Sequence, residues 1–173
     1  MDKIKVGIAG CLGRMGQELV KATTKDKRIK FVGGYDLKNS KTHSNDIFQG
    51  ANIIIDFSSP AAIKGNVSLA LSYKTGLVVG TTGLNHKETI LLKKASKKIP
   101  ILYSSNMSLG VNLLFELVRQ TSLALKDIDY DIEISETHHK HKKDAPSGTA
   151  ISLGEIASEG RKIPFSKNKV LNR

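Results

Sequence analysis

Cysteine is almost missing from this sequence, because Cys11 is the only one among its 173 residues. A disulfide within the chain is therefore excluded, and a reducing compartment, the cytoplasm, is expected. Apolar runs are also short. None approaches the ~20 residues that a membrane-spanning helix requires, so no membrane partner is expected. Residues 1–3 lead directly into the first predicted strand, which leaves no room for a signal peptide.

Aromatic residues are scarce as well, at 5% of the chain. Their scarcity helps to decide whether the positive charge of the chain indicates a nucleic-acid-binding surface. Lys and Arg number 27 against 16 Asp and Glu, which gives a net charge of +11. These cations are dispersed over predicted helix faces and loops, without the interleaved aromatic residues of a nucleic-acid surface. Solubilising surface lysines explain the charge more simply, so we expect no nucleic-acid partner.

Three glycines follow the first predicted strand, residues 4–9. Gly10, Gly13 and Gly16 form the spacing G-x-x-G-x-x-G, a variant of the dinucleotide fingerprint G-x-G-x-x-G, and open a predicted helix. Such a loop permits a tight turn, close approach of the backbone to a pyrophosphate, and close packing of helix on strand. A second predicted strand ends in Asp36, placed where an acid can hold the adenosine ribose. The pattern predicts a dinucleotide site.

Strands and helices then alternate along the chain. The predicted strands are 29–36, 51–57, 76–80 and 99–103, and the predicted helices are 60–73 and 85–98. Their continuous hydrophobicity is typical of a parallel sheet covered on both faces. Small polar clusters follow the strands at Ser58–Ser59, Thr81–Thr82 and Ser104–Asn106, at the edge where open α/β sheets bind ligands. The expected fold is a Rossmann-like, doubly wound α/β domain.

The second half of the chain has a different pattern. A long amphipathic helix is predicted over 111–125, and residues 130–136 alternate between apolar and polar, as in a strand with one wet side. We therefore expect a change of sheet between residues 106 and 110. The predicted organisation is a dinucleotide-binding domain over 1–107 and a partial α+β domain over 108–173.

Residues 136–149 concentrate three His and three Lys around a Pro-Ser-Gly turn. Cations this close repel one another unless an anion binds among them or the His stay neutral. Ser147, Gly148 and Thr149 open a predicted helix, whose N-terminal N–H groups also favour an anion. The segment predicts a pocket for a small dianion beside a proton donor. A solvated basic loop or a weak nickel or zinc chelator is the alternative. No metal site is expected, since no Cys or carboxylate pattern accompanies the His.

Five segments occur together in a characteristic order: Gly-Arg-Met-Gly at 13–16, Asp-Phe-Ser at 56–58, Gly-Thr-Thr-Gly at 80–83, Asn-Met-Ser-Leu-Gly-Val-Asn at 106–112, and 138–150. With them the chain, from residue 4 to about residue 157, resembles the dihydrodipicolinate reductase family, also named 4-hydroxy-tetrahydrodipicolinate reductases. The most specific segment reads H-H-x-H-K-x-D-A-P-S-G-T. The resemblance implies reduction of a dicarboxylate ring with NADH or NADPH in lysine and diaminopimelate biosynthesis, by a homotetramer.

The resemblance also implies a role for each candidate residue. His138 would donate a proton, Lys142 would be a second proton-donating or charge-neutralising group, and the substrate carboxylates would lie on His139, Gly148 and Thr149. The cofactor pyrophosphate would lie on Gly10, Cys11, Leu12, Gly13, Arg14 and Met15, and the ribose on Asp36. The nicotinamide would be flanked by Gly80, Thr81, Thr82, Ser104, Ser105, Asn106 and Met107. Domain 108–173 would bind substrate and build the tetramer.

Some positions depart from the family's pattern. Leu37 follows Asp36 where NADPH-preferring members often have Arg, and Ser59 also stands where some have Arg. NADH should therefore serve at least as well as NADPH, although Lys38 could reach a phosphate. Met107 stands where Phe is common.

Length is the largest departure. Family members continue beyond this chain's length, so the resemblance implies a fragment or a C-terminally truncated product. A non-catalytic dinucleotide-binding relic remains an alternative. A semialdehyde dehydrogenase is excluded, because it needs a catalytic cysteine in the second half of the chain and Cys11 is the only cysteine.

Overall fold

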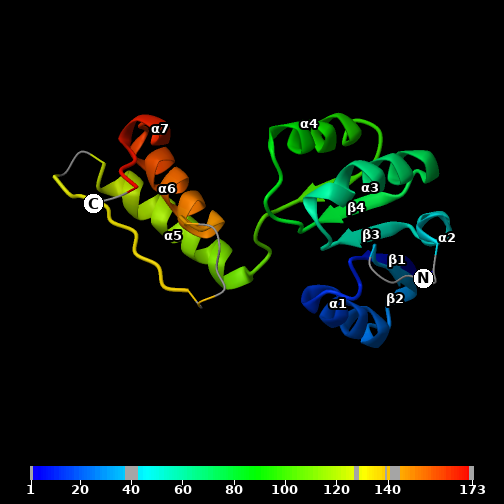
Figure 1. Cartoon of the computed structure of the whole chain (residues 1–173). Coiled ribbons are helices and arrows are strands. Elements are labelled where there is room, and N and C mark those ends of the chain that lie inside the picture. Colours follow the sequence, from blue (N-terminus) through cyan, green and yellow to red (C-terminus); the bar gives the residue numbers. More distant parts are fainter. Residues whose placement is uncertain (1, 38–42, 127–128, 139, 141–144, 172–173) are drawn as a thin grey trace. The chain divides into compact units, whose positions relative to one another are not determined.

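The computed structural model describes residues 2–37, 43–126, 129–138, 140 and 145–171. The chain divides into two compact units, Met1–Ser105 (unit 1) and Asn106–Arg173 (unit 2) (Figure 1). Within the described ranges, no helix has the length and apolar character needed to cross a membrane. The functions expected for domains 1–107 and 108–173 stay predictions.

Unit 1 is a five-stranded parallel sheet with helices, which confirms the expected α/β class. Its strands are β1 (Ile4–Ala9), β2 (Ile29–Tyr35), β3 (Ile53–Asp56), β4 (Gly76–Val79) and β5 (Ile101–Tyr103). Its helices are α1 (Arg14–Lys25), α2 (Ser44–Gly50), α3 (Pro60–Tyr73) and α4 (His86–Ala95). The strand order is β2-β1-β3-β4-β5, and every neighbouring pair is parallel. The order reverses between β1 and β3, which makes their carboxyl ends the switch point where such sheets bind ligands.

Local signals in the sequence explain where two of the helices begin and end. α3 starts with Pro60, which suits the first helical turn, and stops at Lys74, whose φ of 56° is left-handed. α4 opens with the predicted capping box. Asn85 Oδ1 accepts from the backbone N–H groups of Lys87 and Glu88, and the Glu88 carboxylate accepts from Asn85 N at 2.7 Å.

The helices lie on both faces of the sheet. The crossover through α1 runs toward one edge of the sheet, and those through α2, α3 and α4 run toward the other. Because such crossovers are right-handed, α1 covers one face and the other three helices cover the opposite face. α2 contacts α3 and α3 contacts α4, so these three form a continuous layer.

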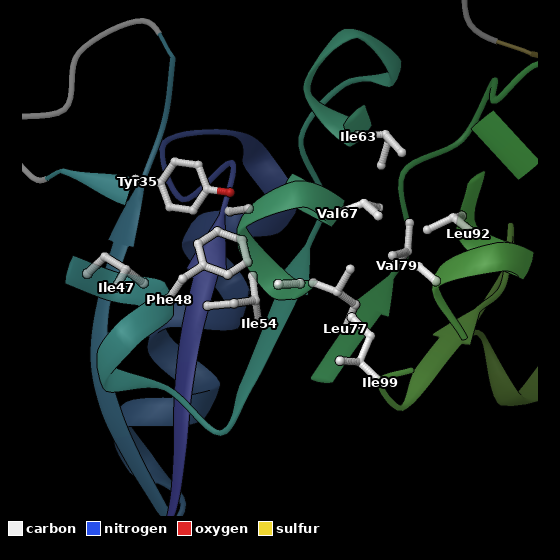
Figure 2. Packing of buried hydrophobic residues seen from close by; sticks show 13 residues of the cluster. Tyr35, Ile47, Phe48, Ile54, Ile63, Val67, Leu77, Val79, Leu92 and Ile99 are labelled. Carbon is white, nitrogen blue, oxygen red and sulfur yellow. The ribbon is translucent and has the colours of Figure 1, made fainter. Parts of the chain in front are cut away.

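The core lies between that layer and the sheet (Figure 2). Ile54 of β3 is fully buried there with Phe48 of α2 and Ile63 of α3. The rings of Tyr35 and Phe48 pack at 5.9 Å between centroids, tilted by 48°. α2 was not anticipated from the sequence, although its Ile47 and Phe48 are core residues.

Unit 2 is built on two packed helices, α5 (Leu109–Ala124) and α6 (Gly148–Arg161), followed by a short α7 (Phe165–Asn168). Small side chains, among them Ser122 of α5 and Ala157 of α6, are buried in this unit. The strand expected over 130–136 is wrong for this structure, because residues 129–138 have no regular secondary structure. A strand requires a hydrogen-bonded neighbour, and no described part of unit 2 pairs with this segment.

Candidate active site

The glycine loop lies at the switch point of the sheet. Gly10 has a φ of +77°, and a side chain at this position would meet the backbone of Phe57 at 2.5 Å. The loop is tied to the end of β2, because Gly10 N and Cys11 N both donate to Tyr35 O, at 2.9 and 3.3 Å. Gly13 N closes the turn on Gly10 O at 3.1 Å. The predicted tight turn is therefore present.

The first turn of α1 faces this loop. Its N-cap is Gly13, which has no side chain that could accept from the N–H groups of this turn. A Cβ on Gly16 would come within 2.0 Å of Gly10 O, which explains why only glycine allows the helix to pack this close. Arg14 and Met15 are exposed on this turn.

A cavity of about 460 Å³ lies beside the carboxyl end of β2, between that end and α3. It is lined by Tyr35, Asp36, Leu37, His43, Ser44, Ala61, Ala62, Gly65, Asn66 and Leu69. Burial, and then the charge of Asp36, raise the pKa of the Cys11 thiol in the glycine loop. The sequence indicated Asp36 but not His43, Ser44 or Asn66, which share no motif with it.

The carboxyl ends of β3, β4 and β5 carry the remaining candidates of unit 1. The Thr81 side chain is buried and points inward, where its Oγ1 lies 3.0 Å from Asp56 Oδ1. Thr82 and Ser105 are exposed, and Ser104 N donates to Val79 O at 3.1 Å. The loop after β4 can therefore offer the Thr82 side chain and backbone groups to a ligand, while Thr81 holds the loop from inside.

Asn106 and Met107 belong to unit 2, at the start of α5. Asn106 Oδ1 accepts from Ser108 N at 2.9 Å, and Asn106 O accepts from Asn112 Nδ2 at 3.1 Å. These bonds shape the turn before the helix, where Ser108 is the N-cap. Met107 is partly exposed beside it.

The basic segment of unit 2 contains an ordered cluster of three side chains. His138 Nε2 donates to Glu136 Oε2 at 2.9 Å. The same carboxylate receives Ser147 N on Oε1 at 2.7 Å and Ser147 Oγ on Oε2. The hydrogen bonds from Ser147, followed by the one from His138, lower the pKa of Glu136 to about 2. Glu136 is therefore held as an anion between the two.

This cluster is joined to the N-terminus of α6. Ser147 is the N-cap, and its Oγ accepts from Ala150 N at 3.1 Å. Gly148 and Thr149 lie in the first turn of the helix, as the sequence predicted, and both are exposed. His139 and Lys142 lie outside the described residues. In the part of the chain that is described, no group of three or more metal-binding side chains occurs.

Glu136 was missed as a site residue. Its two-residue spacing from His138 was the available signal, because residues i and i+2 of an extended segment point to the same side. The contact with Ser147, eleven residues away, depends on the chain turning back, which the spacing does not show.

A parallel sheet in the order 2-1-3-4-5, with a glycine loop at its switch point, defines a doubly wound α/β protein. The family is more specific. The family model described as "Dihydrodipicolinate reductase, N-terminus" matches residues 4–107, and that described as "Dihydrodipicolinate reductase, C-terminus" matches residues 110–171. The chain therefore belongs to the dihydrodipicolinate reductase family.

Individual relatives agree with this assignment. The chain is 43% identical over 164 residues to the 4-hydroxy-tetrahydrodipicolinate reductase of Zymomonas mobilis, covering 92% of this chain and 64% of that protein. It is 44% identical over 181 residues to the reductase of Sulfurimonas denitrificans, covering 98% and 70%. The chain thus spans about two thirds of the length of the relatives it matches.

A solved structure gives a similar result. The dipicolinate-bound dihydrodipicolinate reductase from Paenisporosarcina sp. TG-14 has a TM-score of 0.71 to this chain at 27% sequence identity. The match covers 92% of this chain and 67% of that one.

Proposed function

We propose that the chain is a reductase, or part of one, that uses NADH or NADPH to reduce 4-hydroxy-tetrahydrodipicolinate to tetrahydrodipicolinate in lysine and diaminopimelate biosynthesis. Membership of the family supports this proposal. The observation that carries it furthest is the Glu136 cluster. One carboxylate holds both His138 and the N-cap of α6, so a proton donor and an anion-binding helix end lie side by side.

The glycine loop and the edge of the sheet suit a dinucleotide. The pyrophosphate would lie on the Gly10–Met15 segment, because the N-cap Gly13 has no side chain to occupy the N–H donors of the first turn of α1. The ribose would lie at Asp36, in the cavity beside β2. The nicotinamide would lie near Gly80–Thr82 and Ser104–Met107. When bound, the nicotinamide supplies hydride to an unsaturated carbon of the substrate ring.

His138 would complete the reduction by giving a proton to the neighbouring ring carbon. Because Nε2–H is held by Glu136, Nδ1 is the ring nitrogen left to carry the transferred proton. Glu136 would thus act as a positioning residue that orients the ring and balances the charge of the imidazolium form. The same carboxylate fixes Ser147, which keeps the helix end beside the ring.

The substrate is a dianion, and α6 offers donors for it. Gly148 and Thr149 lie in the first helical turn, where N–H groups and the helix dipole favour a carboxylate. His139 and Lys142 are proposed as further carboxylate-binding and charge-neutralising groups. Thr149→Val and Lys142→Ala are expected to weaken substrate binding or lower the rate, and unchanged constants in both would move the pocket elsewhere.

NADH is proposed to serve at least as well as NADPH. Asp36 disfavours a 2′-phosphate, because its carboxylate and the phosphate carry charges of the same sign. Leu37, at the position where an Arg would act, is 77% exposed. Side-by-side affinity measurements for the two cofactors test this choice.

A homotetramer in the cytoplasm completes the proposal. Support for assembly comes from the exposed apolar side chains of unit 2, such as Leu113 and Leu117 of α5. Support for the compartment comes from the single cysteine. Light scattering after size-exclusion chromatography tests the tetramer.

The deciding experiment is a turnover assay on the 173-residue chain, combined with calorimetric titration of NADH, NADPH and dipicolinate. Oxidation of the cofactor that depends on the dicarboxylate substrate supports the reductase. Cofactor binding without turnover and without dipicolinate binding would instead support a dinucleotide-binding relic.

A further inference from the structure

A fully buried carboxylate lies at the end of β3, beside the switch point. Asp56 is 0% exposed. Its Oδ1 accepts from Ser58 N at 3.0 Å, from Ser58 Oγ at 2.5 Å and from Thr81 Oγ1 at 3.0 Å, and its Oδ2 accepts from Asn66 Nδ2 at 2.7 Å. All of these partners, among the described residues, are neutral donors.

Such an arrangement has an energetic consequence. A buried charge is unfavourable unless several good hydrogen bonds replace its lost hydration. Four donors from two loops and one helix meet this requirement at Asp56. Displacing any one of these donors would leave the buried Asp56 carboxylate with too few hydrogen bonds, which costs free energy. The carboxylate therefore fixes the positions of all its donors.

The contacts extend from Asp56 toward the cavity beside β2. Asn66 Oδ1 accepts from Tyr35 OH at 2.6 Å, and both residues line that cavity together with Asp36. Tyr35 O also receives the glycine-loop donors Gly10 N and Cys11 N. Burial and the charge of Asp56 raise the pKa of Tyr35, so its hydroxyl stays protonated and keeps donating to Asn66.

The contacts extend equally toward the loop after β4. Thr81 Oγ1 accepts from Ser58 N at 3.0 Å while donating toward Asp56. The Phe57 ring lies against Gly80, and Gly80 N donates to Asp56 O at 2.9 Å. The ends of β3 and β4 thus meet at one carboxylate, and the end of β2 is linked to it through Asn66.

We propose that Asp56 is a positioning residue for the cofactor. Through hydrogen bonds to its one carboxylate, it fixes the position of the adenosine-cavity wall, Tyr35 and Asn66, relative to the loop after β4, where the nicotinamide would bind. The proposal rests on the dinucleotide site put forward above. Asp56 contacts neither half of the cofactor in this scheme. It acts through Asn66 and Tyr35 on one side and through Thr81 on the other.

Two fragments of the cofactor separate the two sides. ADP reports on the adenosine cavity, and reduced nicotinamide mononucleotide reports on the loop after β4. In Asp56→Asn an amide donor faces the other donors, so the affinity for both fragments is expected to fall about tenfold. Tyr35→Phe should weaken ADP binding alone, and Thr81→Val should weaken binding of the nicotinamide fragment alone.

Thr75→Val is the matched control. Thr75 is also a buried threonine, whose Oγ1 donates to Phe48 O at 2.9 Å, but it precedes β4 and lies at the opposite end of the strand. This variant should lower the melting temperature about as much as Thr81→Val and leave both fragment affinities unchanged. A purely structural role for Asp56 would make the variants differ in melting temperature only.

Each outcome has a defined meaning. Folded Asp56→Asn with wild-type affinity for both fragments would overturn the proposal. If Asp56→Asn fails to fold, the pair Tyr35→Phe and Thr81→Val decides, and equal effects of each on both fragments, or none, would overturn it. Failure of the wild-type chain to bind NADH or NADPH would instead overturn the dinucleotide site itself.

Discussion

Unit 1 and unit 2 differ in what they bury. The hydrophobic core cluster lies entirely within unit 1, between the sheet and the α2–α4 layer (Figure 2). Among the described residues of unit 2, those that are buried are small or polar, such as Ser122, Ala157 and Ser158, while large apolar side chains such as Leu117 and Ile132 stay exposed. Unit 1 therefore has the means to be stable by itself, and unit 2 depends on helix pairing and polar contacts.

The candidate chemistry is divided in the same way. The residues proposed for the pyrophosphate and ribose are in the well-packed unit, and the proposed proton donor is in the sparsely packed one. A rigid frame suits a cofactor site, because ordering is not required at each binding event. The contrast can be tested by changing one unit and measuring a property of the other.

Loss of the proton donor should have the largest effect. His138→Gln is expected to lower turnover by roughly 10²- to 10⁴-fold, the range for loss of a general acid, while NADH affinity stays unchanged because unit 1 is untouched. Steady-state kinetics and fluorescence titration measure the two quantities. His86→Gln, an exposed histidine of α4, is the control. Turnover near wild type for His138→Gln would contradict the assignment.

A substitution that creates a cavity in the core of unit 1 should have the second largest effect. Phe48→Ala is expected to reduce the free energy of unfolding by about 3–5 kcal/mol, because Phe48 is fully buried. Leu117→Ala, at a site that is 53% exposed, should change it by less than about 0.5 kcal/mol. Chemical denaturation measures both. Equal effects of the two substitutions would show that unit 2 has a core of its own.

Cofactor choice should respond to one residue of unit 1. Leu37→Arg is expected to improve NADPH binding over NADH by about tenfold, because a guanidinium beside Asp36 can pair with a 2′-phosphate. Leu37→Gln, which adds length without charge, should leave the ratio unchanged. Dissociation constants for both cofactors provide the test, and a ratio unaffected by Arg would place the 2′-position away from Leu37.

The smallest expected effect concerns the pH dependence of unit 2. The folded pKa of Glu136 is lowered from 4.5 to about 2, so its contribution to stability is present above pH 4.5 and is lost as pH falls toward 2. Asp26 and Glu116 have similarly lowered pKa values, so the comparison must be made with Glu136→Gln. The difference in melting temperature between wild type and this variant should shrink from pH 6 to pH 2. A constant difference would contradict the cluster.

Much of the fold was predictable because its signals are local. The glycine spacing, Pro60 at the start of α3 and the capping box of α4 each act within one turn of chain, and all three are present. α2 was not predictable in this way. Its first turn, Ser44-Asn45-Asp46, is typical of a loop, and burial of Phe48 beside Tyr35 of β2 makes it a helix of the core.

The candidate site was predictable in its residues but not in its contacts. The strand expected over 130–136 failed because alternation shows which side of a segment is apolar, and it does not supply a partner strand. Glu136 and Asp56 were overlooked as site residues, because the partners that make them important, Ser147 for Glu136 and Asn66 and Thr81 for Asp56, are distant in the sequence.

By itself the sequence determined the order of the five strands of unit 1, the glycine loop and the basic segment over 136–149, since backbone preference and side-chain period act between near neighbours. Only the tertiary structure decided which distant side chains form hydrogen bonds with one another. Tyr35 and Asn66 are 31 residues apart, and Asp56 and Thr81 are 25 apart. Hydrogen bonds require approach to about 3 Å, and packing of the parallel strands and of α3 on the sheet brings these side chains to that distance.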